Sequence, residues 1–364
     1  MFGVITEELL MGVNDWRSAA NREHLVEPLE FDSFLRPQVW GGDALSRYLG
    51  KPVSGTVPIG ESWEVSGLSE HPSIVLRGAF AGQSLSDLWT SHREDLAGRI
   101  VGVSTFPLFV KWLDCRQFLS VQVHPNDAMA REVLGQVSGK SEAWVVVHAE
   151  PTARIYAGLR PGVTQHELLS RLEAGTVAEC LHSFVPQVGD CISLPAGTVH
   201  SAGGGVVFAE VQQPSDTTFR LFDWNRLGLD GQSRPLHLDM AMKSITWPQG
   251  PVSPSIPIPL NCLHGVHGEL LLQTPAFHLE RYTVRGMWPQ PHSGEMTIWM
   301  VTDGAAVLDG AGCAPRQIVP RGSTVLIPAA ARGANWAAAD VDKPCRLLCI
   351  RLPSVPSRNC FILT

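Results

Sequence analysis

The sequence lacks a long apolar run and an excess of positive charge, and each shortage excludes a class of protein. No uninterrupted apolar segment approaches the roughly 18 residues needed to span a bilayer. The first twelve residues carry Glu7 and Glu8 where a secretory signal has basic residues followed by an apolar stretch. Lys and Arg total 28 against 35 Asp and Glu, a net charge of -7, so the chain has no general basic surface for nucleic acid. We expect a soluble cytoplasmic protein whose partners include neither nucleic acid nor membrane.

Closely spaced cysteine pairs are also missing. The eight cysteines are scattered, without the pairs of a zinc ribbon or the density of a disulfide-stapled scaffold. Cys345 and Cys349 stand four apart in a strand-like segment, and we predict two buried free thiols there.

What the 364 residues do contain is an ordinary globular balance, 44% hydrophobic and 17% charged, enough for two domains or one large one. Proline and glycine repeatedly interrupt short β-rich runs. The sequence predicts only three clear helices, over 83–100, 126–135 and 164–184. The pattern is typical of an antiparallel β-sandwich or barrel with a helical insertion, since strands and helices do not alternate regularly.

The segment 245–262 carries five prolines and no periodic pattern, as a linker does. We place a domain boundary there, giving domains 1–252 and 253–364. The second part repeats the shape of the segment before His200, a glycine turn, a short apolar strand and a proline, but without the histidine. The matching position falls at Ala331 and Arg332, so we infer a duplicated barrel whose second copy has lost its ligands.

Polar residues occur at strand spacing in the first domain. Gln122 and His124 are two apart in SVQVHPND and project from one face of a strand, and Lys140 and Glu142 have the same spacing. His200 follows a Pro-Ala-Gly turn. Two imidazoles, a carboxylate and an amide oxygen around one cavity would suit a zinc ion with an open coordination position. The alternative is that both histidines are hydrogen-bonded interior residues.

Six blocks in the first domain resemble the type I mannose-6-phosphate isomerases, zinc-dependent enzymes of the cupin superfamily. The chain's length and the short insertion between Glu142 and His200 are similar to the short bacterial subgroup. The blocks are RPQVWGGDAL (36–45), PIGESWEVSG (58–67), FPLFVKWLDCRQFLSVQVHPND (106–127), GKSEAWVVV (139–147), VGDCISLPAGTVHSAGGG (188–205) and EVQQPSDTTFRLFDW (210–224).

The resemblance implies a mainly β chain of two jelly-roll cupin domains, the first catalytic with a small helical insertion and the second degenerate. It implies one Zn²⁺ bound by His124, Glu142 and His200, with Gln122 as a further ligand. It implies an isomerase that interconverts mannose-6-phosphate and fructose-6-phosphate through a cis-enediol or enediolate. Its remaining implied site residues are Arg220, Lys140 and Glu210 for catalysis and Trp40, Glu61, Lys111, Ser120 and Asp216 for the sugar phosphate.

Several of these residues also have a plain structural interpretation. Trp40 could pack a turn against the core. Glu61 and Glu64 suggest one acidic strand face, which a solvated edge would explain as well as a substrate contact. Arg220 could lie at the surface. Lys111 lies in an apolar strand and requires a buried partner, which favours a pocket.

The general base is left open between Glu210 and Lys140, and Ser120 and Lys111 are candidates for the phosphate end. Two other functions compete with the isomerase. Iron-dependent dioxygenases use similar ligands on the same fold, although the Gln-x-His pair speaks against them. A non-catalytic metal-containing sugar-binding or regulatory protein with two cupin domains is the second.

Overall fold

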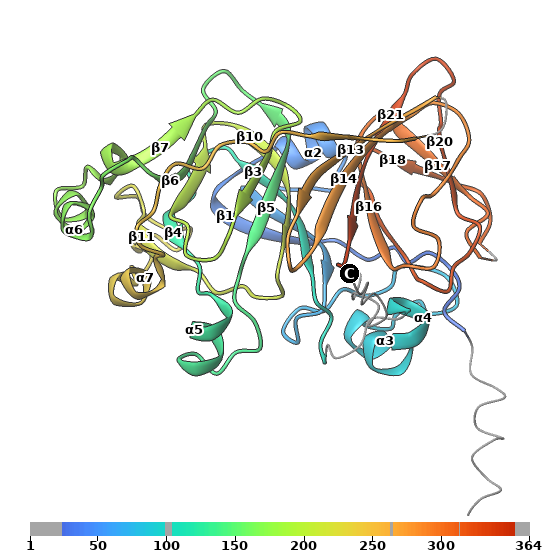
Figure 1. Ribbon diagram of the computed structural model, residues 1–364, viewed down its shortest axis with the longest axis horizontal. Coiled ribbons are helices and arrows are strands. Elements are labelled where there is room, and N and C mark those ends of the chain that lie inside the picture. The colour runs from blue at the N-terminus through green and yellow to red at the C-terminus, as the bar shows by residue number, and fades with distance from the viewer. Residues whose placement is uncertain (1–23, 99–103, 263–264, 313, 354–364) are drawn as a thin grey trace, which may run out of the picture.

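The protein is described by a computed structural model that covers residues 24–98, 104–262, 265–312 and 314–353. Two β-sandwiches lie side by side, the first in blue, green and yellow and the second in orange and red (Figure 1). The predicted mainly β architecture with few helices is confirmed. No helix in the described ranges is long and apolar enough to cross a membrane. Glu7 and Glu8 lie outside these ranges.

The first sandwich has an antiparallel sheet of six strands and one of five. The larger sheet contains, in spatial order, β1 (Phe34–Gly42), β2 (Ile59–Ser66), β3 (Phe109–Cys115), β10 (Val206–Gln212), β5 (Glu142–Ala149) and β8 (Cys191–Leu194). The smaller sheet contains β11 (Phe219–Phe222), β4 (Val121–Val123), β9 (His200–Gly203), β6 (Arg154–Leu159) and β7 (Leu181–Phe184).

The second sandwich repeats this order of strands. Its larger sheet runs β12 (Ile258–Leu260), β13 (Val266–Gln273), β14 (His278–Val284), β21 (Cys345–Arg351), β16 (Thr297–Asp303) and β19 (Thr324–Ile327). Its smaller sheet runs β15 (Trp288–Pro289), β20 (Asn335–Ala338), β17 (Ala305–Asp309) and β18 (Gln317–Pro320). The two sandwiches therefore correspond in every strand but β11, which has no counterpart among the described strands, and this correspondence supports the predicted duplication.

Strand register shows which residues occupy equivalent places in the two sandwiches. Trp144 and Trp299 each lie on the fifth strand of the larger sheet in its spatial order, β5 and β16. Trp144 lies opposite Glu210 of β10, and Trp299 lies opposite Cys349 of β21. Two residues before each tryptophan stand Glu142 and Thr297, so threonine replaces the predicted carboxylate ligand in the second copy.

The residue that corresponds to His200 in the second sandwich is not the one that the sequence suggested. Gln122 pairs with His200 in the first sandwich, and Trp288 pairs with Trp336 at the corresponding place in the second. By strand register Trp336 corresponds to His200, so the position predicted at Ala331 and Arg332 is wrong. Two apolar indoles fill the space that an amide and an imidazole occupy in the first copy, which supports the inference that this copy has lost its ligands.

The helices are short and lie between strands. They are α2 (Ala44–Leu49), α3 (Leu85–Ser91), α4 (Arg93–Ala97), α5 (Asp127–Glu132), α6 (Gln165–Glu173), the 3-10 turn η2 (Val177–Cys180) and α7 (Leu238–Ser244). The helix predicted over 126–135 is confirmed in its first part by α5, where the Asn126 side chain accepts from the Met129 amide.

The other two predicted helices are shorter than expected. The one over 83–100 ends at Ser91 and resumes at Arg93, and residues 99–100 lie outside the described ranges. The one over 164–184 stops at α6, because Gly175 adopts a left-handed φ of 70° and β7 then pairs with β6.

One apolar core runs through both sandwiches. It includes Val65 and Trp112 from the first and Ile298, Leu326 and Leu348 from the second, all buried. The proposed boundary between residues 252 and 253 lies in the stretch from α7 to β12 and separates the sheets, although the core crosses it. Cys345 and Cys349 are buried free thiols, as predicted.

Candidate metal centre and substrate cavity

His124 leaves the end of β4 and points to the interior of the first sandwich. Val121 and Val123 face the other way into an apolar cluster, which fixes the side of the strand from which Gln122 projects. Immediately after His124 the chain turns, and the Pro125 carbonyl accepts from the Lys140 amide at 2.9 Å. That hydrogen bond brings the start of β5 beside the end of β4.

Glu142 and His200 are each the first residue of a strand. Glu142 begins β5 and lies opposite Leu194, and His200 begins β9 opposite Gln122. The Pro-Ala-Gly turn before His200 contains Gly197, whose φ of 89° is left-handed and whose amide donates to the His124 carbonyl at 2.9 Å. Local turns on two strands thus bring the three predicted ligands together.

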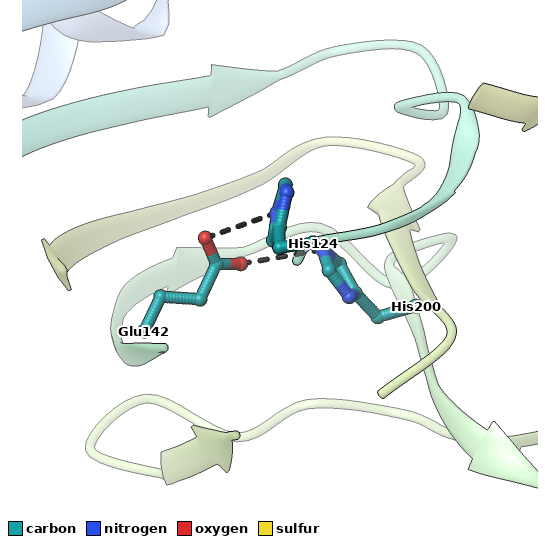
Figure 2. Close-up of side chains that lie close together, drawn as sticks. All are labelled: His124, Glu142 and His200. Carbon is teal, nitrogen blue, oxygen red and sulfur yellow. Dashed lines mark ion pairs between the residues drawn. The ribbon is translucent and has the colours of Figure 1, made fainter. Parts of the chain in front are cut away.

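The three side chains converge on one point, as Figure 2 shows. His124 Nε2 lies 3.3 Å from Glu142 Oε2, and His200 Nε2 lies 3.3 Å from Glu142 Oε1. All three residues are at least 98% buried. Among the described residues, His124 Nε2 and both Glu142 oxygens have no hydrogen-bond partner. Buried polar atoms that face one another without such a bond are typical of ligands that await a cation.

The outer nitrogens of the two imidazoles are already held. His124 Nδ1 donates to the Thr217 carbonyl at 2.9 Å, and His200 Nδ1 donates to the Thr198 carbonyl at 2.8 Å. These bonds leave the Nε2 lone pairs directed inward, which is the arrangement of metal-binding histidines. The alternative of an ordinary interior histidine fits His124 poorly, because such a residue would use both nitrogens and His124 Nε2 has no hydrogen-bond partner among the described residues.

The electrostatics keep this centre in a ligating form. Burial and the positive charge of Lys140 lower the pKa of His124 to about 3, and burial also lowers the pKa of His200. Burial opposes ionisation of Glu142, but Lys140 and the two imidazoles outweigh it and lower the pKa of this carboxyl well below its ordinary value. At neutral pH the centre holds two neutral imidazoles and a carboxylate.

Gln122 borders the centre. Its Nε2 lies 3.2 Å from His200 Nε2, and its Oε1 accepts from the Ser120 hydroxyl at 3.0 Å. A half-turn of the amide would direct the oxygen to the same point as the other ligands.

A polar cavity of about 280 Å³ opens beside the centre. Nine of the twelve predicted site residues line it, while the metal-ligand triad lies just behind, in contact through Gln122 and through Lys140, whose Nζ is 3.2 Å from Glu142 Oε2. The nine are Trp40, Glu61, Lys111, Ser120, Gln122, Lys140, Glu210, Asp216 and Arg220.

The Lys111 ammonium group is surrounded by three carboxylates. Its Nζ is 3.5 Å from Glu61, 3.3 Å from Glu210 and 3.7 Å from Asp216. Burial opposes protonation of Lys111, but the carboxylates raise its pKa above the ordinary value. Burial and the charge of Glu142 in turn raise the pKa of Glu210. The lysine is thus compensated inside the protein, as the sequence required.

The predicted acidic face of β2 is wrong. Glu61 points to the cavity, whereas Glu64 lies on the opposite face, where it pairs with Lys51 at 2.7 Å. Residues three apart in a strand face opposite sides. Both carboxylates are buried, so neither marks a solvated edge.

The cavity is also lined by five polar residues that were not predicted from the sequence: Arg36, Gln38, Thr218, Arg234 and His237. Strand spacing could have indicated three of them. Arg36, Gln38 and Trp40 are two apart and so share a strand face, and Thr218 stands two residues before Arg220. Arg234 and His237 lie in the loop before α7 and carry no such signal in the sequence.

A second group of potential ligands, Glu280, His292 and Cys349, lies in the second sandwich. There the carboxylate is already satisfied: its oxygens accept from His292 at 2.6 Å, Tyr282 at 2.8 Å and Arg351 at 3.0 Å. This contrast with Glu142 assigns the group a structural role. A larger cavity of about 430 Å³ lies between the sandwiches, and no residue of either group lines it.

The comparisons with known proteins agree with this geometry. Residues 29–140 match the family described as "Phosphomannose isomerase type I, catalytic domain". Over 229 residues the chain is 38% identical to the mannose-6-phosphate isomerase ManA of Bacillus subtilis, covering 62% of this chain and 70% of that protein. The chain belongs to the type I mannose-6-phosphate isomerases. The family resemblance seen in the sequence is thereby confirmed.

Two further relatives support the membership. The isomerase shares 34% identity over 262 residues with the mannose-6-phosphate isomerase of Streptococcus mutans, covering 72% of this chain and 80% of that one. Its structure superposes on that of the mannose 6-phosphate isomerase from Bacillus subtilis with a TM-score of 0.81 at 25% identity, over 90% of this chain and all of the other. The predicted cupin-type fold is confirmed with it.

Proposed function

We propose that this isomerase interconverts mannose-6-phosphate and fructose-6-phosphate and that His124, Glu142 and His200 hold a zinc ion for the reaction. The observation that carries the proposal is the convergence of two imidazoles and a carboxylate beside a polar cavity, with His124 Nε2 and both Glu142 oxygens lacking a hydrogen bond among the described residues. Two imidazoles and one carboxylate, with no thiolate, are the ligands of catalytic rather than structural zinc. Gln122 is proposed as a fourth ligand.

When bound, zinc would supply Lewis-acid stabilisation of negative charge on the sugar oxygens. Side chains of the protein would carry out the proton transfer. The reaction moves one proton between C1 and C2 and passes through a cis-enediol or enediolate, so a group beside the sugar must take the proton and return it. Glu210 and Lys140 are the two candidates, and both line the cavity.

The two candidate bases contact different neighbouring side chains. Glu210 accepts from the indole of Trp144 at 3.0 Å and faces Lys111, and burial raises its pKa, which increases the basicity of its carboxylate. Lys140 contacts the metal ligand Glu142 directly. Wash-in of deuterium at C2 of mannose-6-phosphate in D₂O distinguishes them: Glu210→Gln abolishes the exchange if the carboxylate is the base, and Lys140→Met does so if the amine is.

Arg220 suits charge stabilisation rather than proton transfer. It pairs with Gln122 across β11 and β4, so its side chain projects toward the same cavity, and its Nε has no hydrogen-bond partner in the described part of the chain. A guanidinium stays protonated at neutral pH and would face the oxygens on which the enediolate charge develops.

A coupled assay with mannose-6-phosphate, run beside metal analysis, tests the function. We expect about one zinc per chain, loss of turnover after chelation with EDTA, and recovery when Zn²⁺ is restored. Bound metal without turnover would overturn the enzymatic proposal in favour of a sugar-binding or regulatory protein. Oxygen consumption in the presence of iron would instead indicate a dioxygenase.

A further inference from the structure

The segment 223–237, directly after β11, has no part in the mechanism above. Its first residue, Asp223, binds two arginines of the same segment. Arg234 donates to it through Nε at 2.7 Å and Nη2 at 2.5 Å, and Arg226 donates through Nη2 at 2.8 Å. The arginine side chains are only 17% and 13% exposed. One buried carboxylate thus orients two guanidinium groups.

The backbone turns sharply to make this possible. Trp224 and Asn225 both adopt left-handed φ values, 57° and 53°, a conformation that is unfavourable for residues other than glycine. The chain then folds back through a short bridge and a turn around Gly231. His237 closes the segment: its amide donates to the Arg220 carbonyl at 2.8 Å, and its Nδ1 accepts from the Arg220 amide at 3.2 Å.

The two arginines differ in where they face. Arg234 lines the substrate cavity together with Arg220 and His237, whereas Arg226 is not among the lining residues. Within the described chain, Nη1 of Arg234 and Nε of Arg220 have no hydrogen-bond partner. Burial and then the charge of Arg234 lower the pKa of Arg220, so the two cations lie close to each other.

Charge is therefore divided between two parts of the cavity. Around Lys111 stand three carboxylates, which would repel a phosphate dianion. Beside Arg220 stand Arg234 and His237, with Asp223 as the carboxylate that holds Arg234 from behind. A guanidinium fixed by a carboxylate on one edge offers its other edge to an oxyanion without losing further side-chain entropy.

We propose that Arg234, fixed by Asp223 and assisted by Arg220, binds the phosphate group of the sugar phosphate and makes the enzyme select phosphorylated hexoses. The inference rests on the proposed isomerase function and moves the phosphate end of the substrate away from Lys111. Arg234 is a specificity residue: it contacts the unreactive end of the substrate and leaves the chemistry at C1 and C2 to the metal centre.

Steady-state kinetics of Arg234→Ala, with Arg226→Ala as the matched control, test the assignment. Both variants remove one arginine from Asp223, but only the first removes a cavity-lining charge. For Arg234→Ala we expect the KM for mannose-6-phosphate to rise about 10- to 100-fold, with a much smaller change in kcat. The inhibition constant of inorganic phosphate should rise with it. Relative to wild type, kcat/KM should fall far less for unphosphorylated mannose than for mannose-6-phosphate.

The outcomes separate this inference from the function on which it rests. A wild-type protein without isomerase activity overturns the function. An active wild type whose Arg234→Ala variant keeps its KM and its phosphate inhibition, or loses mannose and mannose-6-phosphate turnover equally, overturns the role of Arg234 alone. An equal effect of Arg226→Ala would do the same, since it would reduce both arginines to supports of Asp223. If Arg234→Ala does not fold, Arg234→Gln keeps a donor to Asp223 without the charge and serves in its place.

Discussion

Single residues in this protein differ mainly in whether their buried polar atoms are satisfied. Glu142 is enclosed and has no hydrogen bond, whereas Glu280 is enclosed and has three within the described chain. Lys140 compensates the charge of Glu142, but a buried carboxylate without hydrogen bonds and with two imidazoles at 3.3 Å is suited to bind a cation. The same reasoning separates Arg220, whose Nε is unpaired, from a surface arginine.

The residues proposed for metal binding and for charge stabilisation should separate in experiment. His124→Ala removes one of three ligands, and we expect both bound zinc and turnover to be lost. Arg220→Ala leaves the ligands in place, so zinc should remain near one per chain while kcat falls about 100-fold or more. Metal analysis and the coupled assay on the same samples check this. Wild-type kcat in the arginine variant would refute its role.

Asp114 allows a pH prediction away from the active site. Burial raises its pKa to about 6, although its Oδ2 accepts from the Ala44 amide at 2.6 Å and Arg47 and Arg116 favour its ionised form. The folded-state pKa lies above the unfolded one, so the folded protein binds more protons between about pH 4 and 6. The free energy of unfolding therefore falls as the pH rises through this window.

Asp114→Asn should remove that penalty, because an amide oxygen can still accept from the Ala44 amide and carries no charge. Urea unfolding at pH 7.5 should show the variant more stable than wild type by up to about 3 kcal/mol, with the difference shrinking toward pH 4.5. A difference that is independent of pH would show that ionisation of Asp114 is not its cause.

Among the elements, the turns before the strands decide the geometry of the site. β9 can present His200 only because the turn ending at Thr198 packs against α7 and the segment after it. The amide of Thr246 donates to the Gly197 carbonyl at 3.1 Å, and a Cβ on Gly197 would overlap the Thr246 hydroxyl. A left-handed glycine in close contact cannot be replaced without displacing its neighbours.

Gly197→Ala should therefore lower both stability and metal affinity. We expect a loss of about 2 to 4 kcal/mol in the free energy of unfolding, from backbone strain and overlap together, and a reduced zinc content. Gly162→Ala is the control, since Gly162 has a similar φ of 86° but open space around it. It should cost only about 1 kcal/mol and retain zinc. Equal losses in the two variants would contradict the role given to the Gly197 turn.

At the scale of the whole molecule, the two sandwiches share a core even though the functional residues lie in one of them. The indole of Trp112 donates to the Gly322 carbonyl at 3.0 Å, and Arg281 Nη1 donates to the Gly189 carbonyl at 2.7 Å. The amides of Ala329 and Ala330, in the turn after β19, also donate to carbonyls of α4 across the junction. The second sandwich therefore completes the packing of the first.

Without the second sandwich, we expect that the first does not fold stably. A chain ending at residue 252 retains all the proposed site residues but exposes the apolar surface around Val65 and Trp112. We expect it to aggregate or to bind hydrophobic dyes, and the full chain to unfold in one cooperative transition. Calorimetry of the full chain checks the second part, and two resolved transitions would contradict it.

Local patterns pointed to the side chains that converge in the structure, because the geometry of a strand is a local property. The spacing of Gln122 and His124 places both on one side of β4 in any sheet, and a Pro-Ala-Gly turn before His200 restricts how that strand begins. The spacing of Lys140 and Glu142 carries the same information. What spacing left undecided, the family resemblance supplied.

The sequence by itself determined the strand-rich composition, the duplicated pattern and the candidate ligands His124, Glu142 and His200, because alternation and turn chemistry depend on near neighbours in the chain. Only the tertiary structure decided that Arg234 and His237 meet Arg220, that Lys111 lies among three carboxylates, and that residues 164–184 end as a strand. These outcomes depend on contacts between residues distant in sequence, and on sheet pairing strong enough to override local helix propensity.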